Sequence, residues 1–142
     1  MLKGISPLLS PDLLKVLAEM GHGDELLLSD AHYPALSAGC QIIHSPGVSV
    51  PQLLDAILGV WTLDRYVENP LFMMQPVPGD ALDPQFCREI SGVLSKHNED
   101  VKVGEIERFA FYDRVKSEAR CVVVTGETRI YGNLIIKKGV IA

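Results

Sequence analysis

The chain has 142 residues, 47% hydrophobic and 22% charged, with a net charge of -5. This composition excludes disorder and is typical of one compact domain that needs neither disulfides nor a structural metal. The negative net charge and the lack of a Lys/Arg cluster argue against a nucleic-acid partner, because binding to the phosphate backbone relies on basic surfaces. No window is apolar for long enough to span a membrane or to form a signal peptide, so we expect no membrane partner and a cytoplasmic location.

Helix starts can be read from capping residues followed by proline. Ser10-Pro11, Ser49-Val50-Pro51 and Asp83-Pro84 each place a capping side chain before a proline in the first helical turn. The spacing of apolar residues then predicts four helices, at about 11–20, from 49 onward, at 83–97 and at 108–119. The second of these helices is expected to include Trp61 on its apolar face.

Short apolar runs between these helices predict strands. They lie at 25–30, 41–43, 71–75, 101–106, 121–125 and 134–137. Alternation of strands and helices predicts an α/β fold: a layered single domain over 1–142 with a central mixed sheet flanked by helices. The apolar segments 71–74 and 134–142 are either core strands or part of a contact between subunits.

The stretch MGHGDELLLSDAHYP suggests a metal site, since His22, Asp24, Asp30 and His32 are all possible ligands. The two His/Asp pairs lie at opposite ends of one predicted strand, roughly 20 Å apart at about 3.3 Å per residue. One ion cannot contact both ends, and neither an HExxH spacing nor a CxxC pair is present among the three cysteines. We therefore predict no metal, and a metal-dependent hydrolase using His22, Asp24 and His32 is kept only as an alternative.

His22 and Asp30 are candidates for a proton-transfer and ligand-binding site. His22 lies between two glycines just after a predicted helix, where an imidazole can approach a ligand and exchange a proton near neutral pH. Asp30 ends the first strand, where α/β sheets commonly bind ligands, and His32 is a second candidate there. The alternatives are a solvated Gly-His-Gly turn and an Asx turn.

Two later segments add polar candidates. Arg108 lies at a predicted helix start, where the dipole does not favour a cation, so a polar ligand or a surface ion pair would explain it. Tyr131, Gly132 and Asn133 precede the last strand and could bind sugar hydroxyls or form an ordinary turn. No GxGxxG, P-loop or GxSxG string occurs, so no nucleotide cofactor or serine nucleophile is predicted.

Four segments taken together resemble one known family, the L-fucose mutarotases and D-ribose pyranases, and specifically its fucose-type branch. They are LLKVLAEMGHGDELLLSDAHYP at 13–34, MMQPVPGD at 73–80, ERFAFYDR at 107–114 and VVTGETRIYGNLIIKKGV at 123–140. The resemblance extends over nearly the whole chain. The pyranase branch is expected to carry histidine at the position of Arg108, which favours the fucose-type branch.

The resemblance implies cofactor-free interconversion of the α and β anomers of a monosaccharide, with L-fucose as the leading substrate. It assigns the catalytic histidine to His22 and sugar binding to Asp30, Arg108 and the segment Tyr131-Gly132-Asn133. Members are α/β proteins that form ring-like homo-oligomers, such as a decamer, with sugar sites near subunit contacts. A non-catalytic monosaccharide-binding or regulatory module is the alternative.

Overall fold

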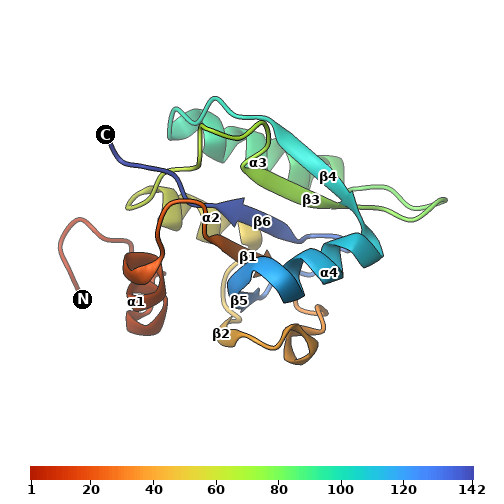
Figure 1. Ribbon diagram of the computed structural model, residues 1–142, viewed down its shortest axis with the longest axis horizontal. Coiled ribbons are helices and arrows are strands. Elements are labelled where there is room, and N and C mark those ends of the chain that lie inside the picture. Colours follow the sequence, from red (N-terminus) through yellow and green to blue (C-terminus); the bar gives the residue numbers. More distant parts are fainter.

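A computed structural model describes residues 1–142 and contains a six-stranded sheet with helices on both faces (Figure 1). The helices are α1 (Pro11–Glu19), α2 (Val50–Leu58), α3 (Pro84–Lys96), α4 (Arg108–Glu118) and the short 3-10 helix η1 (Ala35–Ala38). The strands are β1 (Glu25–Ser29), β2 (Gln41–Ser45), β3 (Leu71–Gln75), β4 (Val103–Glu107), β5 (Ala119–Thr125) and β6 (Leu134–Lys137).

Each predicted helix and strand is present, and the α/β prediction is confirmed. The capping residues act as expected: Ser10 accepts a hydrogen bond from the backbone of Leu13, and Ser49 forms a capping box with Gln52. Several bounds differ from the prediction: β4 lies at Val103–Glu107 rather than 101–106, and β5 begins at Ala119, where the last helix is expected to end. Helix α2 ends at Leu58, so Trp61 lies beyond it, and η1 has no counterpart in the sequence pattern because four residues are too few to show a period.

The sheet has the strand order β2-β5-β1-β6-β3-β4 and is mixed, as predicted. Strand β1 pairs in parallel with β5, and β5 with β2; β3 pairs in parallel with β4. Only β6, in the interior of the sheet, runs antiparallel to its neighbours β1 and β3. Five strands therefore end at the same edge, where β6 begins.

Side chains alternate between two hydrophobic layers along the buried strands. Leu26 and Leu28 face the larger core, formed with α1, α2 and α3, whereas Leu27 faces the smaller core with α4 and η1. Phe111 and Val115, four residues apart on α4, anchor that helix on its face of the sheet. Figure 1 shows α4 crossing one face, with α2 and α3 behind the other.

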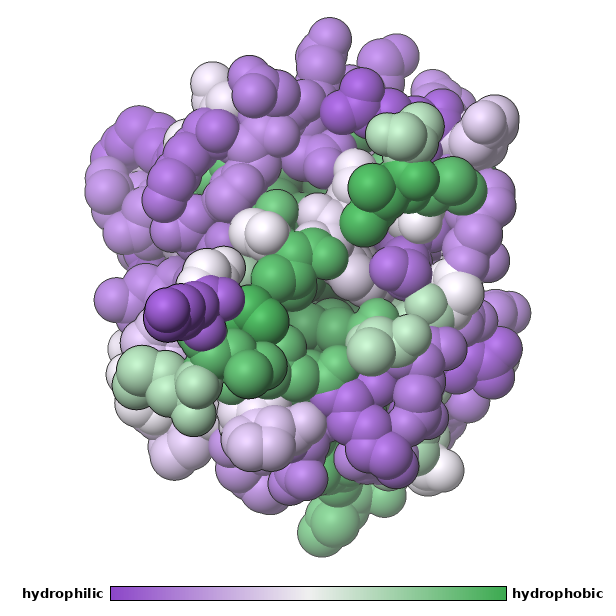
Figure 2. Space-filling view, turned by 90° about the vertical axis from the view of Figure 1, so that its left-hand side faces the viewer, coloured by the Kyte–Doolittle hydropathy of each residue, from purple (hydrophilic) through white to green (hydrophobic).

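Apolar side chains also reach the surface at the end of the molecule where the two termini lie. Figure 2 shows a band of hydrophobic residues across this face. Met1, Leu2, Val140 and Ile141 are exposed, while Leu71 and the apolar residues of β6 are buried in the core. Segment 71–74 and strand β6 are thus core strands, and the terminal residues remain available for contacts. None of the helices has the length and apolar character needed to cross a bilayer.

Candidate functional site

A cavity of about 330 Å³ lies at the edge where the parallel strands end. Its lining combines residues that follow β1, β3 and β4 with residues that precede β6. They are Asp30, His32, Tyr33, Met74, Asp80, Arg108, Tyr112, Ile130, Tyr131 and Asn133. Of the predicted sugar-binding residues, Asp30, Arg108, Tyr131 and Asn133 are thus brought together from segments about a hundred positions apart. The volume is within the range of small-molecule sites.

Asp30 is fixed at the base of this cavity. Asp30 is only 5% exposed, and its Oδ1 accepts a hydrogen bond from the backbone N–H of His32 at 2.9 Å. Asn133, just before β6, holds Asp30 on two sides: Asn133 Nδ2 donates to Asp30 Oδ2 at 3.1 Å, while Asn133 Oδ1 accepts from the Asp30 backbone at 2.8 Å. The cavity therefore contains a preoriented carboxylate with lone pairs left for hydroxyl groups.

Burial raises the pKa of Asp30 above its ordinary value of 3.8, although hydrogen bonds from His32 and Asn133 partly oppose the shift. The ionised carboxylate is the better acceptor for sugar hydroxyls. Acidification should therefore protonate Asp30 and begin to weaken monosaccharide binding already at a pH above 3.8. Measuring the Kd for L-fucose as a function of pH checks this. In an Asp30→Asn variant, whose side chain does not titrate, the rise in Kd on acidification should be absent. A wild-type Kd constant down to pH 3.8 would contradict it.

The segment 131–133 forms a turn with a left-handed backbone conformation at Tyr131. Tyr131 has φ of 60°, and its hydroxyl donates to Oδ2 of Asp80, which also lines the cavity, at 2.6 Å. At Gly132 a Cβ atom would come within 2.7 Å of Glu127 Cγ and 2.9 Å of the Arg129 carbonyl oxygen. Gly132 is thus required for close packing of the turn rather than for direct contact with the cavity.

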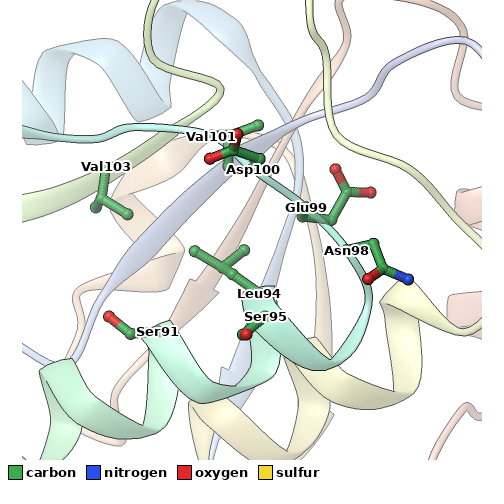
Figure 3. Close-up of a pocket in the computed structure, with 8 residues that line it drawn as sticks. All are labelled: Ser91, Leu94, Ser95, Asn98, Glu99, Asp100, Val101 and Val103. Atoms are coloured by element: carbon green, nitrogen blue, oxygen red, sulfur yellow. The ribbon is translucent and has the colours of Figure 1, made fainter.

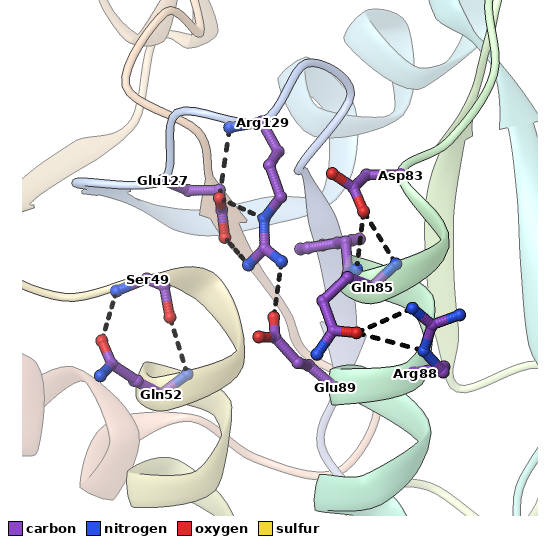
Figure 4. Close-up of polar contacts among 9 residues, drawn as sticks. Ser49, Gln52, Asp83, Gln85, Arg88, Glu89, Glu127 and Arg129 are labelled. Carbon is purple, nitrogen blue, oxygen red and sulfur yellow. Dashed lines mark hydrogen bonds and ion pairs between the residues drawn. The ribbon is translucent and has the colours of Figure 1, made fainter.

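Arg129 ties this turn to helix α3 (Figure 4). Its guanidinium donates twice to Glu127, at 2.8 and 2.9 Å, and pairs with Glu89 of α3 at 2.6 Å. The guanidinium also lies 5.2 Å from the centre of the Phe86 ring. Glu127 is 3% exposed, and burial alone would raise its pKa, but Arg129 holds the pKa below the ordinary value.

Arg129→Met should therefore destabilise the protein by about 3 kcal/mol, because it leaves the Glu127 carboxylate buried without its cation. Chemical denaturation measures the loss. The matched control is Arg88→Met, since Arg88 is exposed and its side chain bonds only to Gln85, also on α3. It should change stability by no more than about 0.5 kcal/mol. Equal stability of the two variants would show that the Arg129 pairs contribute little.

Arg108 begins α4 at the rim of the cavity. Glu107 caps the helix through the backbone N–H groups of Phe109 and Ala110, and Arg108 Nε donates to the Tyr112 hydroxyl at 3.2 Å. The guanidinium lies 5.5 Å from the Phe109 ring centre. No carboxylate pairs with Arg108 within 4.0 Å, so its remaining donors are free for a polar ligand.

His22 is not in this cavity. It lies in the turn between α1 and β1, and Asp30 follows the opposite end of the same strand. Five strand residues at about 3.3 Å each separate the two ends by roughly 15 Å or more. His22 is bonded instead to Asp64, with 2.9 Å between His22 Nε2 and Asp64 Oδ1. Within one chain, His22, Asp24 and His32 are not assembled into a group of possible metal ligands.

A larger hollow of about 450 Å³ lies beside the C-terminal half of α3 but contains none of the predicted site residues (Figure 3). Glu99, one of its two acidic residues, accepts hydrogen bonds from the Thr62 hydroxyl at 2.8 Å and the Leu63 backbone at 3.3 Å, so one of its oxygens holds segment 62–63 in place. The smaller cavity at the strand ends is therefore the better candidate.

Comparison with known proteins identifies the family of this chain. Residues 3–141 match the model of the RbsD / FucU transport protein family. The chain belongs to this family. It is 57% identical to an L-fucose mutarotase of Actinobacillus pleuropneumoniae over 99% of this chain and 97% of that protein.

Solved structures of family members share the fold. A fucose mutarotase of Streptococcus pneumoniae in complex with L-fucose is 44% identical and superposes with a TM-score of 0.93, covering 99% of this chain and 100% of the other. Bifidobacterium longum FucU is 42% identical with a TM-score of 0.91 over the same shares. Bacillus subtilis RbsD complexed with D-ribose, at 21% identity and a TM-score of 0.77 over 100% of each chain, shares the fold alone.

The structure adds site residues that the sequence did not single out. Asp80 and Tyr112 orient Tyr131 and Arg108 respectively, and Asp64 is the partner of His22. For Tyr112 the sequence offers a usable signal, because it lies four residues after Arg108 on the predicted helix. Asp80 approaches Tyr131, and Asp64 approaches His22, only because the fold brings distant loops together. The local sequence around either aspartate therefore does not indicate its partner.

Proposed function

We propose that this chain is an L-fucose mutarotase, an isomerase that interconverts the α and β anomers of L-fucose without a cofactor, with residues 1–142 as one sugar mutarotase domain. The observation that carries the proposal is the convergence of Asp30, Arg108, Tyr131 and Asn133 in one cavity. Mutarotase relatives at 57% and 52% identity over 99% of the chain support L-fucose as the substrate.

The cavity suits a polyhydroxylated ligand. The Asp30 carboxylate accepts hydrogen bonds from hydroxyl groups, and the Arg108 guanidinium and the Asn133 amide supply donors. Met74 and Ile130 add apolar surface, which a 6-deoxy sugar can contact through its methyl group. Tyr131 and Asp80, which are bonded to each other, add a hydroxyl and a carboxylate to the lining.

The proposed reaction needs only proton transfer. His22, protonated, donates to the ring oxygen while the anomeric hydroxyl loses its proton to Asp30 or to water, and the bond between C1 and the ring oxygen breaks to give the aldehyde. Rotation about the C1–C2 bond then presents the other face of the aldehyde to the hydroxyl that formed the ring. Reversal of the two proton transfers closes the ring as the other anomer and returns both protons. A positioned acid and base accelerate such a step by about 10²–10⁴-fold.

Because His22 lies at the other end of β1, we propose that a second copy of the chain places its His22 at the cavity. This requires a homo-oligomer, and the family resemblance suggests a closed ring such as a decamer. The exposed terminal residues Met1, Leu2, Val140 and Ile141 give a surface for such a contact. We also propose that the enzyme works in the cytoplasm, with no membrane or nucleic-acid partner.

His32 offers an alternative acid within one chain, because it lines the cavity beside Asp30. Its backbone already donates to Asp30 Oδ1. In that arrangement no second copy would be needed for catalysis. The two alternatives differ in which histidine is essential.

Exchange NMR of L-fucose tests the proposed function directly. Saturating one anomeric proton should reduce the signal of the other anomer when catalytic amounts of purified protein are present, and a chelator should not alter this effect. L-Fucose that binds without faster exchange would identify a non-catalytic sugar-binding module. Loss of exchange on chelation, restored by a stoichiometric ion, would instead indicate metal-dependent chemistry.

A further inference from the structure

The His22–Asp64 pair at the start of β1 has the geometry of a positioned imidazole. Asp64 Oδ1 lies 2.9 Å from His22 Nε2 and also accepts the backbone N–H of Tyr66 at 3.0 Å. The Asp64 side chain is only 4% exposed, whereas that of His22 is 46% exposed. One edge of the ring is therefore held by a buried carboxylate, and the rest faces outward.

The loop that carries Asp64 is fixed against strand β6. The Asp64 backbone donates to the Lys137 carbonyl at 3.0 Å, and Leu63 forms a bridge with Lys138. At Gly139 a Cβ atom would come within 2.3 Å of the Leu63 carbonyl oxygen, so the two segments are in direct contact. The carboxylate is thus positioned by backbone contacts that do not depend on His22.

Asp64 is ionised in this setting. Burial opposes its ionisation, but the Tyr66 N–H, the His22 ring and the nearby Lys137 together hold its pKa below the ordinary value. An ionised carboxylate can only accept a hydrogen bond, so the proton of a neutral His22 must be on Nε2. Nδ1 is then the nitrogen left free to exchange a proton.

We propose that Asp64 is a positioning residue for the mutarotase reaction: it accepts the Nε2–H of His22 throughout, so that the protonated imidazole gives its Nδ1 proton to the sugar ring oxygen, becomes the neutral Nε2–H tautomer, and recovers the proton on ring closure. This role rests on the proposed function, because it needs His22 to be the acid. Asp64 acts only through His22 and does not touch the sugar. Tyr66, whose ring centre lies 5.5 Å from that of His22, flanks the same imidazole.

The tautomer can be observed without any assay of activity. In wild-type protein labelled with 15N-histidine, at about pH 8.5 where imidazoles are neutral, His22 should show a protonated Nε2 and an unprotonated Nδ1. The His22 signals are assigned by their absence from His22→Ala. Asp64→Ala should give a mixture of tautomers, whereas Asp64→Asn, which keeps a carbonyl acceptor, should restore the wild-type form.

Kinetics should separate positioning from a structural role. Asp64→Ala should lower kcat for L-fucose anomer exchange about 10- to 100-fold with KM unchanged, and Asp64→Asn should recover part of the loss. The matched control is Asp55→Ala, which removes the carboxylate of the second His–Asp pair, 2.6 Å from His97 Nε2 and outside the site. It should leave kcat and the His22 signals unchanged.

Three results would overturn the role of Asp64. A proton on Nδ1 of His22 in the wild type would do so even if Asp64→Ala did not fold. An active wild type whose Asp64→Ala variant keeps its kcat would remove the role while leaving the proposed function intact. A folded wild type that binds L-fucose without exchanging its anomers would remove both.

Discussion

His22→Ala is expected to slow catalysed exchange of L-fucose anomers by about 10²–10⁴-fold, the contribution typical of a positioned acid or base. Binding of L-fucose should persist, because the variant retains the hydrogen-bonding groups of the cavity, Asp30, Arg108 and Asn133. A loss in kcat with little change in Kd is therefore the expected signature. Exchange NMR gives the rate, and calorimetry gives the affinity.

The control for this variant is His97→Ala, since His97 also pairs with an aspartate but lies outside the candidate site. It should retain full exchange. His32→Ala supplies the discriminating comparison, because His32 lines the cavity within the same chain. Full activity in His22→Ala together with loss in His32→Ala would transfer the acid role to His32.

Asp30→Ala is expected to weaken L-fucose binding by at least about 100-fold. Hydrogen bonds to a charged group contribute about 1.5–3 kcal/mol each, and a tenfold change in Kd corresponds to about 1.4 kcal/mol. Removing the carboxylate also leaves Asn133 Nδ2 and the His32 N–H without their acceptor. Both the binding group and the shape of the cavity are then lost.

Calorimetric titration with L-fucose measures this effect, with Asp55→Ala as a control because Asp55 pairs with Lys96 and His97 away from the cavity. Circular dichroism establishes that both variants are folded. An Asp30→Ala protein that is folded and binds L-fucose as tightly as the wild type would show that the cavity is not the sugar site.

Much of the fold could be predicted because its signals are local. A capping side chain followed by proline marks the starts of α1, α2 and α3, and each cap forms the expected hydrogen bonds. The apolar run Leu26–Leu28 predicts a buried strand for a similarly local reason, since both faces of the sheet are covered. Strand order could not be predicted, because it depends on contacts between distant segments.

The candidate site was predicted only in part. The sequence pattern places Asp30 at a strand end and singles out Arg108 and segment 131–133 as polar candidates, and the family resemblance assigns sugar binding to them. Strand geometry also predicted correctly that His22 and Asp30 are separated. The partners Asp64 and Asp80 were not predicted, because their hydrogen bonds to His22 and Tyr131 join residues 42 and 51 positions apart.

Mixed oligomers of two inactive variants test most directly whether His22 of one copy acts at the cavity of another. His22→Ala and Asp30→Ala are each expected to be inactive in L-fucose exchange. Coexpressed in equal amounts, they should recover up to about one quarter of wild-type activity, since each half of a shared site is intact with a probability of about one half. Mixed oligomers that remain as inactive as the separate variants would contradict a site shared between subunits.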